Sequence, residues 1–308
     1  MTAGRLEEQA AAWVLRAAGG SRLLRSVRLT GGLTSSVHAV DVEVAGGVHR
    51  LVLRRWTGRP WPDGSVDDGE RMVADEAQVL IAIAGSREPV PALVACDPTG
   101  AEAGLPALLM TRLPGRLDLT PRDPTAWVQL LADRLVRIHH VTPSEPLSPY
   151  ESWLRLDGLD VPRWSNRPDL WRDAIDIGAA AVEVPQIALI HHDYQQFNVL
   201  WSAGRISGVV DWVAASKGPP DDDVMHCRLN LCLLYDADLA LAFQAAYEAG
   251  SGRAAHPWWD VAGVLDYLRG WPAADLQRQA GRRLRIDAAG MNERVEQLLL
   301  AVMRRVGS

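Results

Sequence analysis

The stretch that decides the fold is residues 189–212, LIHHDYQQFNVLWSAGRISGVVDW. Two short apolar runs flank a polar loop that carries Asp193 and, five positions later, Asn198, and the second run ends at Asp211. Short strands of this kind hold polar side chains in fixed positions. Phosphoryl transfer needs a carboxylate that orients a hydroxyl, and a carboxamide and second carboxylate that offer oxygen ligands to Mg²⁺. The order of these groups therefore indicates phosphoryl chemistry.

The same stretch, continued through residues 218–220 to Asp223, resembles the catalytic segment of the aminoglycoside phosphotransferase and choline-kinase-like families, which are relatives of the protein kinases. The resemblance implies that Asp193 is the catalytic base or hydroxyl-orienting residue. It implies that Asn198 and Asp211 bind magnesium. It also implies that Asp223 braces the catalytic loop.

The sequence departs from the family pattern at two places in this segment. His192 replaces the usual glycine, and residues 195–197, Gln-Gln-Phe, replace the customary His-Pro-Gly. Neither change removes a residue that the resemblance assigns to metal binding. Both can reshape the pocket of the phosphoryl acceptor.

Hydrophobic periodicity divides the chain into a β-rich first part and a helical second part. Alternating runs at 37–44 and 48–54 predict a hairpin, with a helix at about 70–84. Further helices are expected at about 222–235, 237–249, 258–268, 273–280 and 289–305. Together with the resemblance, this pattern predicts an α+β, two-lobe, protein-kinase-like fold. Its parts are a small antiparallel nucleotide-binding lobe (1–114), a hinge at about 110–115, and a larger helical catalytic and acceptor-binding lobe (115–308).

A candidate phosphate loop lies between two predicted strands of the first lobe. Small and hydroxyl-bearing residues there allow backbone N–H groups to approach phosphate oxygens. An ordinary hairpin turn uses the same residue types, and this alternative stays open. The candidate nucleotide-binding residues of the loop are Gly31, Gly32, Thr34, Ser35 and Ser36.

Arg54 ends the following strand, where kinases place a phosphate-holding lysine that pairs with a helix glutamate. The chain has 31 arginines and a single lysine, Lys217, so an arginine has to take this role. Neighbouring strand positions point to opposite faces, which leaves Arg54 and the adjacent Arg55 as alternatives. A solvated arginine at a strand end is a third interpretation. Glu76 resembles the glutamate partner, with Glu70 as its alternative.

The predicted hinge includes Thr111 and Leu113, whose backbone groups would meet the purine edge of the nucleotide. The same residues also describe a buried strand followed by a turn. Backbone recognition does not separate ATP from GTP, so either nucleotide is expected as the donor.

Composition excludes several classes of protein. The chain has 308 residues, 48% of them hydrophobic, and a net charge of −6, which argues against a disordered chain and a nucleic-acid partner. No apolar stretch of about 18 residues predicts a membrane span. The three cysteines form no CxxC pair. The charged amphipathic N-terminal segment is unlike a signal peptide, and a cytoplasmic protein is expected.

These observations predict a kinase that uses Mg²⁺ and moves the γ-phosphoryl of ATP or GTP to a hydroxyl of a small molecule. Antibiotic hydroxyls are the leading substrate class of the families it resembles, so an aminoglycoside-type resistance kinase is expected. The acidic excess of residues 115–308 is compatible with a cationic acceptor. The alternatives are a kinase of an ordinary metabolite, such as an amino alcohol or a sugar, and a nucleotide-binding pseudokinase.

Overall fold

The chain divides into two compact units. The computed structural model describes residues 6–29, 35–58, 60, 65–66, 68–180, 182 and 186–306. Unit 1 comprises Met1–Gly115, Pro143–Leu147 and Ser207–Ala214. Unit 2 comprises Arg116–Thr142, Ser148–Ile206 and Ala215–Ser308. The two later segments of unit 1 are a feature that a single boundary at residue 114 does not anticipate, and one of them carries Asp211.

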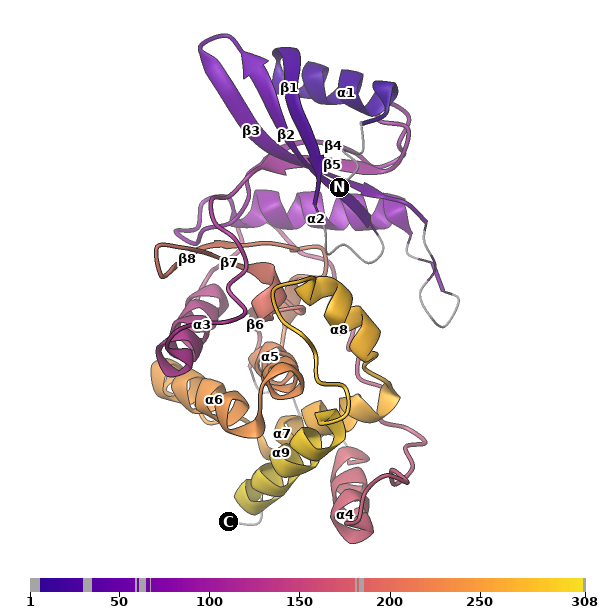
Figure 1. The fold of residues 1–308 in the computed structure, drawn as a ribbon, viewed down its shortest axis with the longest axis vertical. Coiled ribbons are helices and arrows are strands. Elements are labelled where there is room, and N and C mark those ends of the chain that lie inside the picture. Colours follow the sequence, from indigo (N-terminus) through magenta and orange to yellow (C-terminus); the bar gives the residue numbers. More distant parts are fainter. Residues whose placement is uncertain are drawn as a thin grey trace. The chain divides into compact units, whose positions relative to one another are not determined.

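Unit 1 is built on a five-stranded sheet in which all paired neighbours are antiparallel, in the order β1-β2-β3-β5-β4 (Figure 1). The predicted hairpin is confirmed, because Val44 pairs with Gly47 across its turn. Its elements are α1 (Glu8–Ala18), β1 (Gly20–Arg28), β2 (Ser35–Val44), β3 (Gly47–Trp56), α2 (Gly69–Ile83), β4 (Leu93–Asp97) and β5 (Ala107–Thr111).

The two helices of unit 1 bury apolar faces against this sheet. Trp13 and Val14 of α1 join a core cluster with strand residues that include Val42 and Leu53. Helix α2 begins at Asp68, whose side chain accepts hydrogen bonds from two backbone N–H groups of the first turn. The buried side of α2 also carries one charged residue, Glu76.

Unit 2 is mainly helical, and α6 packs against both α3 and α5 (Figure 1). Helix α5 is buried along almost its whole length, including charged residues. The helices are α3 (Pro124–His139), α4 (Pro168–Gly178), η1 (Gln196–Asn198), α5 (Pro220–Leu234), α6 (Ala237–Ser251), α7 (Pro257–Leu265), η2 (Asp266–Arg269), α8 (Ala273–Ala280) and α9 (Met291–Val306). The strands of this part of the chain are β6 (Ala188–Ile190), β7 (Val199–Ser202), β8 (Arg205–Val209), whose last residues belong to unit 1, and β9 (Ser216–Gly218).

The five helices expected after residue 220 are present, whereas α4 was not among the helices expected from the sequence. Pro168 occupies the first turn of α4, where proline is well tolerated. The prolines and tryptophans before it obscure the helical period. No helix within the described ranges is both long and apolar enough to cross a membrane.

A buried polar network lies in the helical core of unit 2. The Arg228 guanidinium donates to Gln244 Oε1 at 2.5 Å and to Asp260 Oδ1 at 2.6 Å. It also donates to the Asp260 carbonyl. All three side chains are buried. Because buried charges require close partners, this network ties α5 to α6 and α7.

Candidate active site

The loop between β6 and β7 brings Asp193 and Asn198 together. Strand β6 pairs antiparallel with β9, so the loop leaves a fixed strand. Asn198 Nδ2 donates to both the Asp193 carbonyl and Asp193 Oδ2, each at 2.8 Å. Because both bonds use the carboxamide nitrogen, Asn198 Oδ1 is the atom that remains for a cation.

The other oxygen of Asp193 accepts two hydrogen bonds. Gln195 Nε2 donates to Asp193 Oδ1 at 2.6 Å, and His226 Nε2 on α5 lies 3.0 Å from the same atom. Burial alone would raise the pKa of Asp193. The hydrogen bond and charge of His226, with smaller effects of His191 and Asn198, outweigh burial and hold this pKa below its usual value. The carboxylate is therefore ionised at neutral pH.

His226 was not among the residues expected from the sequence. Burial alone would lower its pKa, but the hydrogen bond and charge of Asp193, then the charges of Asp266 and Asp222, raise it above the ordinary value. The Asp193 carboxylate thus favours the protonated form of His226.

Asp223 holds the start of the same loop by its backbone. One oxygen accepts from the His192 N–H at 2.7 Å, and the other accepts from the His191 N–H at 2.8 Å and contacts His139 Nε2 at 3.0 Å. Burial would raise the pKa of Asp223, but His139 and then His191 bring it below its usual value. His192 has φ of 69°, a conformation that favours glycine. The contacts of Asp223 keep the loop in a backbone conformation that suits the glycine of the family pattern.

Aromatic side chains surround His192. Its ring stacks on Trp153 with centroids 4.0 Å apart, and Tyr150 lies 5.3 Å away. The Tyr150 hydroxyl donates to Asp222. Asp222 is also buried, and burial raises its pKa to about 7. This cluster makes one side of the loop aromatic.

In unit 1, Arg54 joins three of the predicted site residues. Arg54 Nη1 lies 3.3 and 3.2 Å from the two oxygens of Glu76 and 2.5 Å from Asp211 Oδ1. Arg54 Nε donates to Ser35 Oγ at 3.2 Å. Arg55 instead pairs with a glutamate before α1. The alternation of β3 thus places Arg54, and not Arg55, with the helix glutamate.

Glu76 and Asp211 share Arg54, and the net effect on the buried Glu76 is a pKa raised to about 7. Burial raises the pKa of Glu76, Arg54 lowers it, and the Asp211 carboxylate raises it. Asp211 has φ of 68°, and about a third of its side chain, 35%, is exposed. An exposed carboxylate held in this way suits a hard cation.

The donor set fits magnesium. Each of the two residues offers an oxygen of a kind that Mg²⁺ accepts, a carboxylate from Asp211 and a carboxamide oxygen from Asn198, and Mg²⁺ commonly takes few protein ligands and completes its shell with phosphate and water oxygens. In the part of the chain that the structure describes, no cluster of three or more His, Cys, Asp or Glu side chains has the arrangement of a metal site.

The remaining predicted nucleotide residues have mixed outcomes. Gly31, Gly32 and Thr34 lie outside the described residues, whereas Ser35 and Ser36 are buried at the start of β2. The Thr111 N–H donates to the Ala92 carbonyl at 2.9 Å, and this group is therefore not available to a purine. Leu113 is half-buried, and Glu70 is exposed in the first turn of α2.

The sheet of unit 1, the helical unit 2 and the loop with Asp193 and Asn198 define an α+β kinase-like protein. Residues 27–259 match the sequence model of the phosphotransferase enzyme family, and the chain belongs to this family. It is a phosphotransferase with an alcohol group as acceptor. No curated protein sequence matches the chain.

Solved structures share this fold at low sequence identity. A thermostable mutant of the aminoglycoside phosphotransferase APH(4)-Ia, in complex with ADP and hygromycin B, is 17% identical with a TM-score of 0.59, covering 95% of this chain and 98% of the other. The amicoumacin kinase hAmiN, with AMP-PNP and Ca²⁺, is 14% identical with a TM-score of 0.56, covering 96% and 93%. A Ralstonia eutropha protein assigned as an aminoglycoside phosphotransferase is 16% identical with a TM-score of 0.58, covering 96% and 95%.

Proposed function

We propose that this phosphotransferase moves the γ-phosphoryl of ATP or GTP to a hydroxyl of an antibiotic-like small molecule. The observation that carries the proposal is the ionised Asp193 carboxylate, which Asn198, Gln195 and His226 hold by hydrogen bonds while Asp223 fixes the backbone before it. A base in this state can accept a hydroxyl proton, and its position does not depend on a flexible side chain.

Each residue of the site has a role in the proposed transfer. Asp193 orients the acceptor hydroxyl and takes its proton as the bond from oxygen to the γ-phosphorus forms and the bond to the β-phosphate oxygen breaks. Arg54 binds phosphate oxygens, and Glu76 positions its guanidinium. Asn198 and Asp211 would hold Mg²⁺, which supplies charge neutralisation at the phosphates.

The structural neighbours support a nucleotide donor and an antibiotic acceptor. One of them was solved with ADP and hygromycin B, and another with AMP-PNP and amicoumacin. Retention of Asp193, Asn198 and Asp211 speaks against a pseudokinase. The ion pair of Arg54 with Glu76 also weakens that alternative, because it resembles the lysine–glutamate pair of kinases.

The test is acceptor-stimulated turnover of ATP and of GTP with Mg²⁺, measured over a panel of hydroxylated antibiotics and metabolites. Asp193→Asn should lower the transfer rate by about 10²–10⁴-fold, the contribution of a positioned base. Its nucleotide affinity should stay close to that of the wild type. The matched control is Asp169→Asn, because the Asp169 side chain is 87% exposed and pairs only with Arg172 in the structure described.

Two outcomes contradict the proposal. One is triphosphate turnover that no acceptor stimulates, which would leave a nucleotide-binding protein without the transfer reaction. The other is an Asp193→Asn variant with the turnover of the wild type, which would remove the assigned base.

A further inference from the structure

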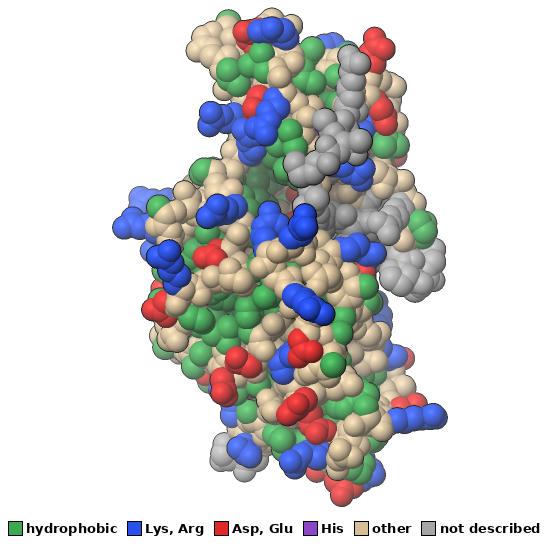
Figure 2. Space-filling view, viewed as in Figure 1, with side chains coloured by type: hydrophobic (Ala, Val, Ile, Leu, Met, Phe, Trp, Pro, Cys, Tyr) green, Lys and Arg blue, Asp and Glu red, His purple; other side chains and the backbone are tan. Residues whose placement is uncertain are grey.

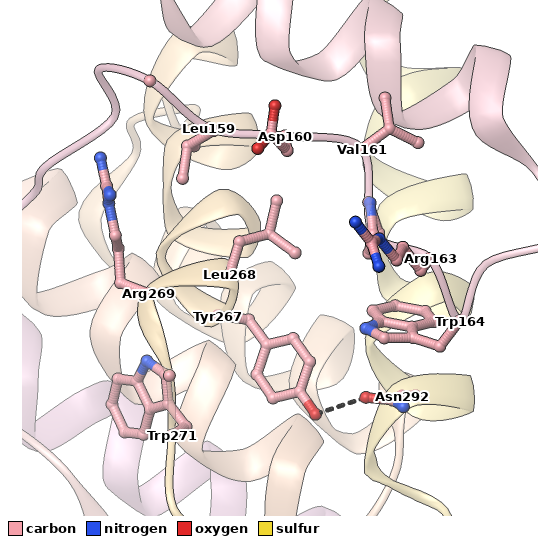
Figure 3. A pocket seen from close by; sticks show the side chains of 13 residues that line it. Leu159, Asp160, Val161, Arg163, Trp164, Tyr267, Leu268, Arg269, Trp271 and Asn292 are labelled. Atoms are coloured by element: carbon pink, nitrogen blue, oxygen red, sulfur yellow. Dashed lines mark hydrogen bonds between the residues drawn. The ribbon is translucent and has the colours of Figure 1, made fainter.

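A pocket of about 490 Å³ lies in unit 2 between residues 158–164 and 267–271 (Figure 3). Asn292 of α9 completes its lining. This volume is within the range of about 300–1,000 Å³ that small-molecule sites occupy. None of these residues was expected to form a site from the sequence, because the first segment lies in a proline- and tryptophan-rich region.

One wall of the pocket is a single side chain away from Asp193. The ring centroid of Trp271, which lines the pocket, lies 5.6 Å from that of His226. His226 in turn is hydrogen-bonded to Asp193. Only the side chains of Trp271 and His226 therefore separate a molecule in contact with Trp271 from the proposed base. This position suits the acceptor of the reaction.

The walls of the pocket are aromatic and held in place. The Tyr267 hydroxyl donates to Asn292 Oδ1 at 2.7 Å, and Trp271 Nε1 donates to Asp266 Oδ2 at 3.1 Å. Trp164 packs edge-on to Tyr267 with centroids 6.3 Å apart. Because these polar atoms already have partners, the rings can pack against a ligand that itself carries rings.

The charges of the lining do not favour a polycation. The charged residues of the lining are Arg163, Arg269 and one carboxylate, Asp160 (Figure 3), and the Arg269 guanidinium already donates to the carbonyls of Arg155 and Asp157. Just outside the lining, Asp157 lies 3.7 Å from Arg269 and balances the charges, and Asp266, whose Oδ2 accepts from Trp271 Nε1, adds one more carboxyl group that does not itself line the pocket. Arg163 is exposed and makes no hydrogen bond or ion pair with the described residues. On the face in Figure 2, acidic side chains lie among arginines rather than in a patch of their own.

We propose that this pocket binds the acceptor, and that the acceptor is a ring-bearing polyol without net positive charge. This inference rests on the proposed phosphotransfer and narrows its substrate class. A polycationic acceptor needs several carboxylates to replace its hydration, whereas the pocket offers one and adds two arginines. The aminoglycoside-type acceptor expected from the resemblance therefore gives way to a neutral or anionic molecule.

The test uses three probes of the same shape and different charge. They are 4-nitrophenyl β-D-glucopyranoside (neutral), 4-nitrophenyl β-D-glucuronide (anionic) and 4-nitrophenyl 2-amino-2-deoxy-β-D-glucopyranoside (cationic). Calorimetric binding to the full chain with ADP and Mg²⁺ should rank the glucuronide first and the amino sugar last. Hygromycin B, a polycation, should bind more weakly than the neutral glucoside.

Charge reversal at Arg163 separates recognition from structural damage. Arg163→Glu should weaken glucuronide binding and strengthen amino-sugar binding, each by about tenfold, as expected for gaining or losing one charge-assisted contact. Simple loss of structure would weaken all three probes together. The control is Arg172→Ala, another exposed arginine whose partner is Asp169 on α4 and which does not line the pocket.

Three results overturn the inference. They are the absence of binding by all three probes, an amino sugar that binds as well as the neutral glucoside, and affinities that Arg163→Glu leaves unchanged. Failure of the proposed function can be told apart from failure of this inference. The first appears as absent phosphoryl transfer with every acceptor, whereas the order of the three binding affinities is measured without turnover. Efficient phosphorylation of a polycation alone would retain the transfer reaction and reject this acceptor class.

Discussion

Replacing Asp223 by asparagine changes one atom at the anchor of the catalytic loop. One Asp223 oxygen accepts the His192 N–H at 2.7 Å, and the other accepts the His191 N–H at 2.8 Å. An amide accepts on one side only, so at least one buried backbone donor must then face an NH₂ group. An orphaned buried donor costs about 1–3 kcal/mol, and the lost ionic character weakens the remaining bonds, giving a total of about 2–4 kcal/mol.

The same change should lower kcat more than it affects nucleotide binding. Asp193 follows directly after the two anchored residues, and a displacement of about 1 Å can cost 10²-fold in rate. We expect kcat to fall by about 10- to 100-fold, while the nucleotide KM changes little because Arg54 lies in unit 1. Urea unfolding measures the stability, and steady-state kinetics with a productive acceptor measure the rate.

A second buried carboxylate provides the control. Asp260→Asn should destabilise unit 2 through the loss of its bonds to Arg228 and Gln244, but these residues are not bonded to the catalytic loop. Its kcat per folded molecule should therefore stay near that of the wild type. The reasoning fails if Asp223→Asn is within about 0.5 kcal/mol of the wild type, the range of ordinary surface substitutions. It also fails if both variants lose kcat equally.

The pKa of Asp223 gives the same experiment a pH dependence. Its pKa is lower in the folded protein than in the unfolded chain, where it is about 3.9. Its stabilising contribution is therefore complete above that value and is lost as the pH falls through the folded pKa. The stability advantage of the wild type over Asp223→Asn should accordingly shrink below about pH 4.

Three further predictions follow from residues described above. Arg54→Ala should weaken nucleotide binding by about 10- to 100-fold in calorimetry, since a bond to a charged group contributes about 1.5–3 kcal/mol, whereas Arg55→Ala should change it less than about twofold; equal losses would contradict the assignment. Arg228→Ala removes the closer of the two cations of the buried Asp260, leaving only Arg305 at 3.6 Å, and should cost about 3–5 kcal/mol in urea unfolding; an Arg228→Leu/Asp260→Leu double variant no more stable than Arg228→Ala would argue against this cause. The folded pKa of His226 is raised, so its stabilising contribution is complete below about pH 6.5 and is lost as the pH rises through the folded value; the stability of the wild type relative to His226→Gln should fall over that range, and a constant difference would contradict it.

The catalytic loop was predictable because its signal is local. Asp193 and Asn198 are five positions apart between two short strands, and the structure brings their side chains to 2.8 Å. The choice between Arg54 and Arg55 was not predictable from their own sequence neighbourhood. The choice depends on which face of the sheet lies against α2, and tertiary packing determines that face.

The aromatic residues around the loop were missed for a related reason. His226 lies three positions after Asp223 on α5, so both can occupy the same helix face, and this spacing was the one available signal. Trp153 and Trp271 have no regular spacing relative to the catalytic segment, although the structure places both rings near His226. This aromatic cluster forms only in the folded protein, where segments distant in the sequence come into contact.

The single lysine, Lys217, lies in β9 at a position that is useful for chemical labelling. Lys217 is exposed, and it pairs in register with Leu189 of β6, the strand that leads into the catalytic loop. Because no other side chain carries an amine, an amine-reactive fluorophore attached to a side chain marks this position alone. Apart from the α-amino group, the chain thus offers one natural attachment point for an optical reporter beside its catalytic loop, without any engineered cysteine.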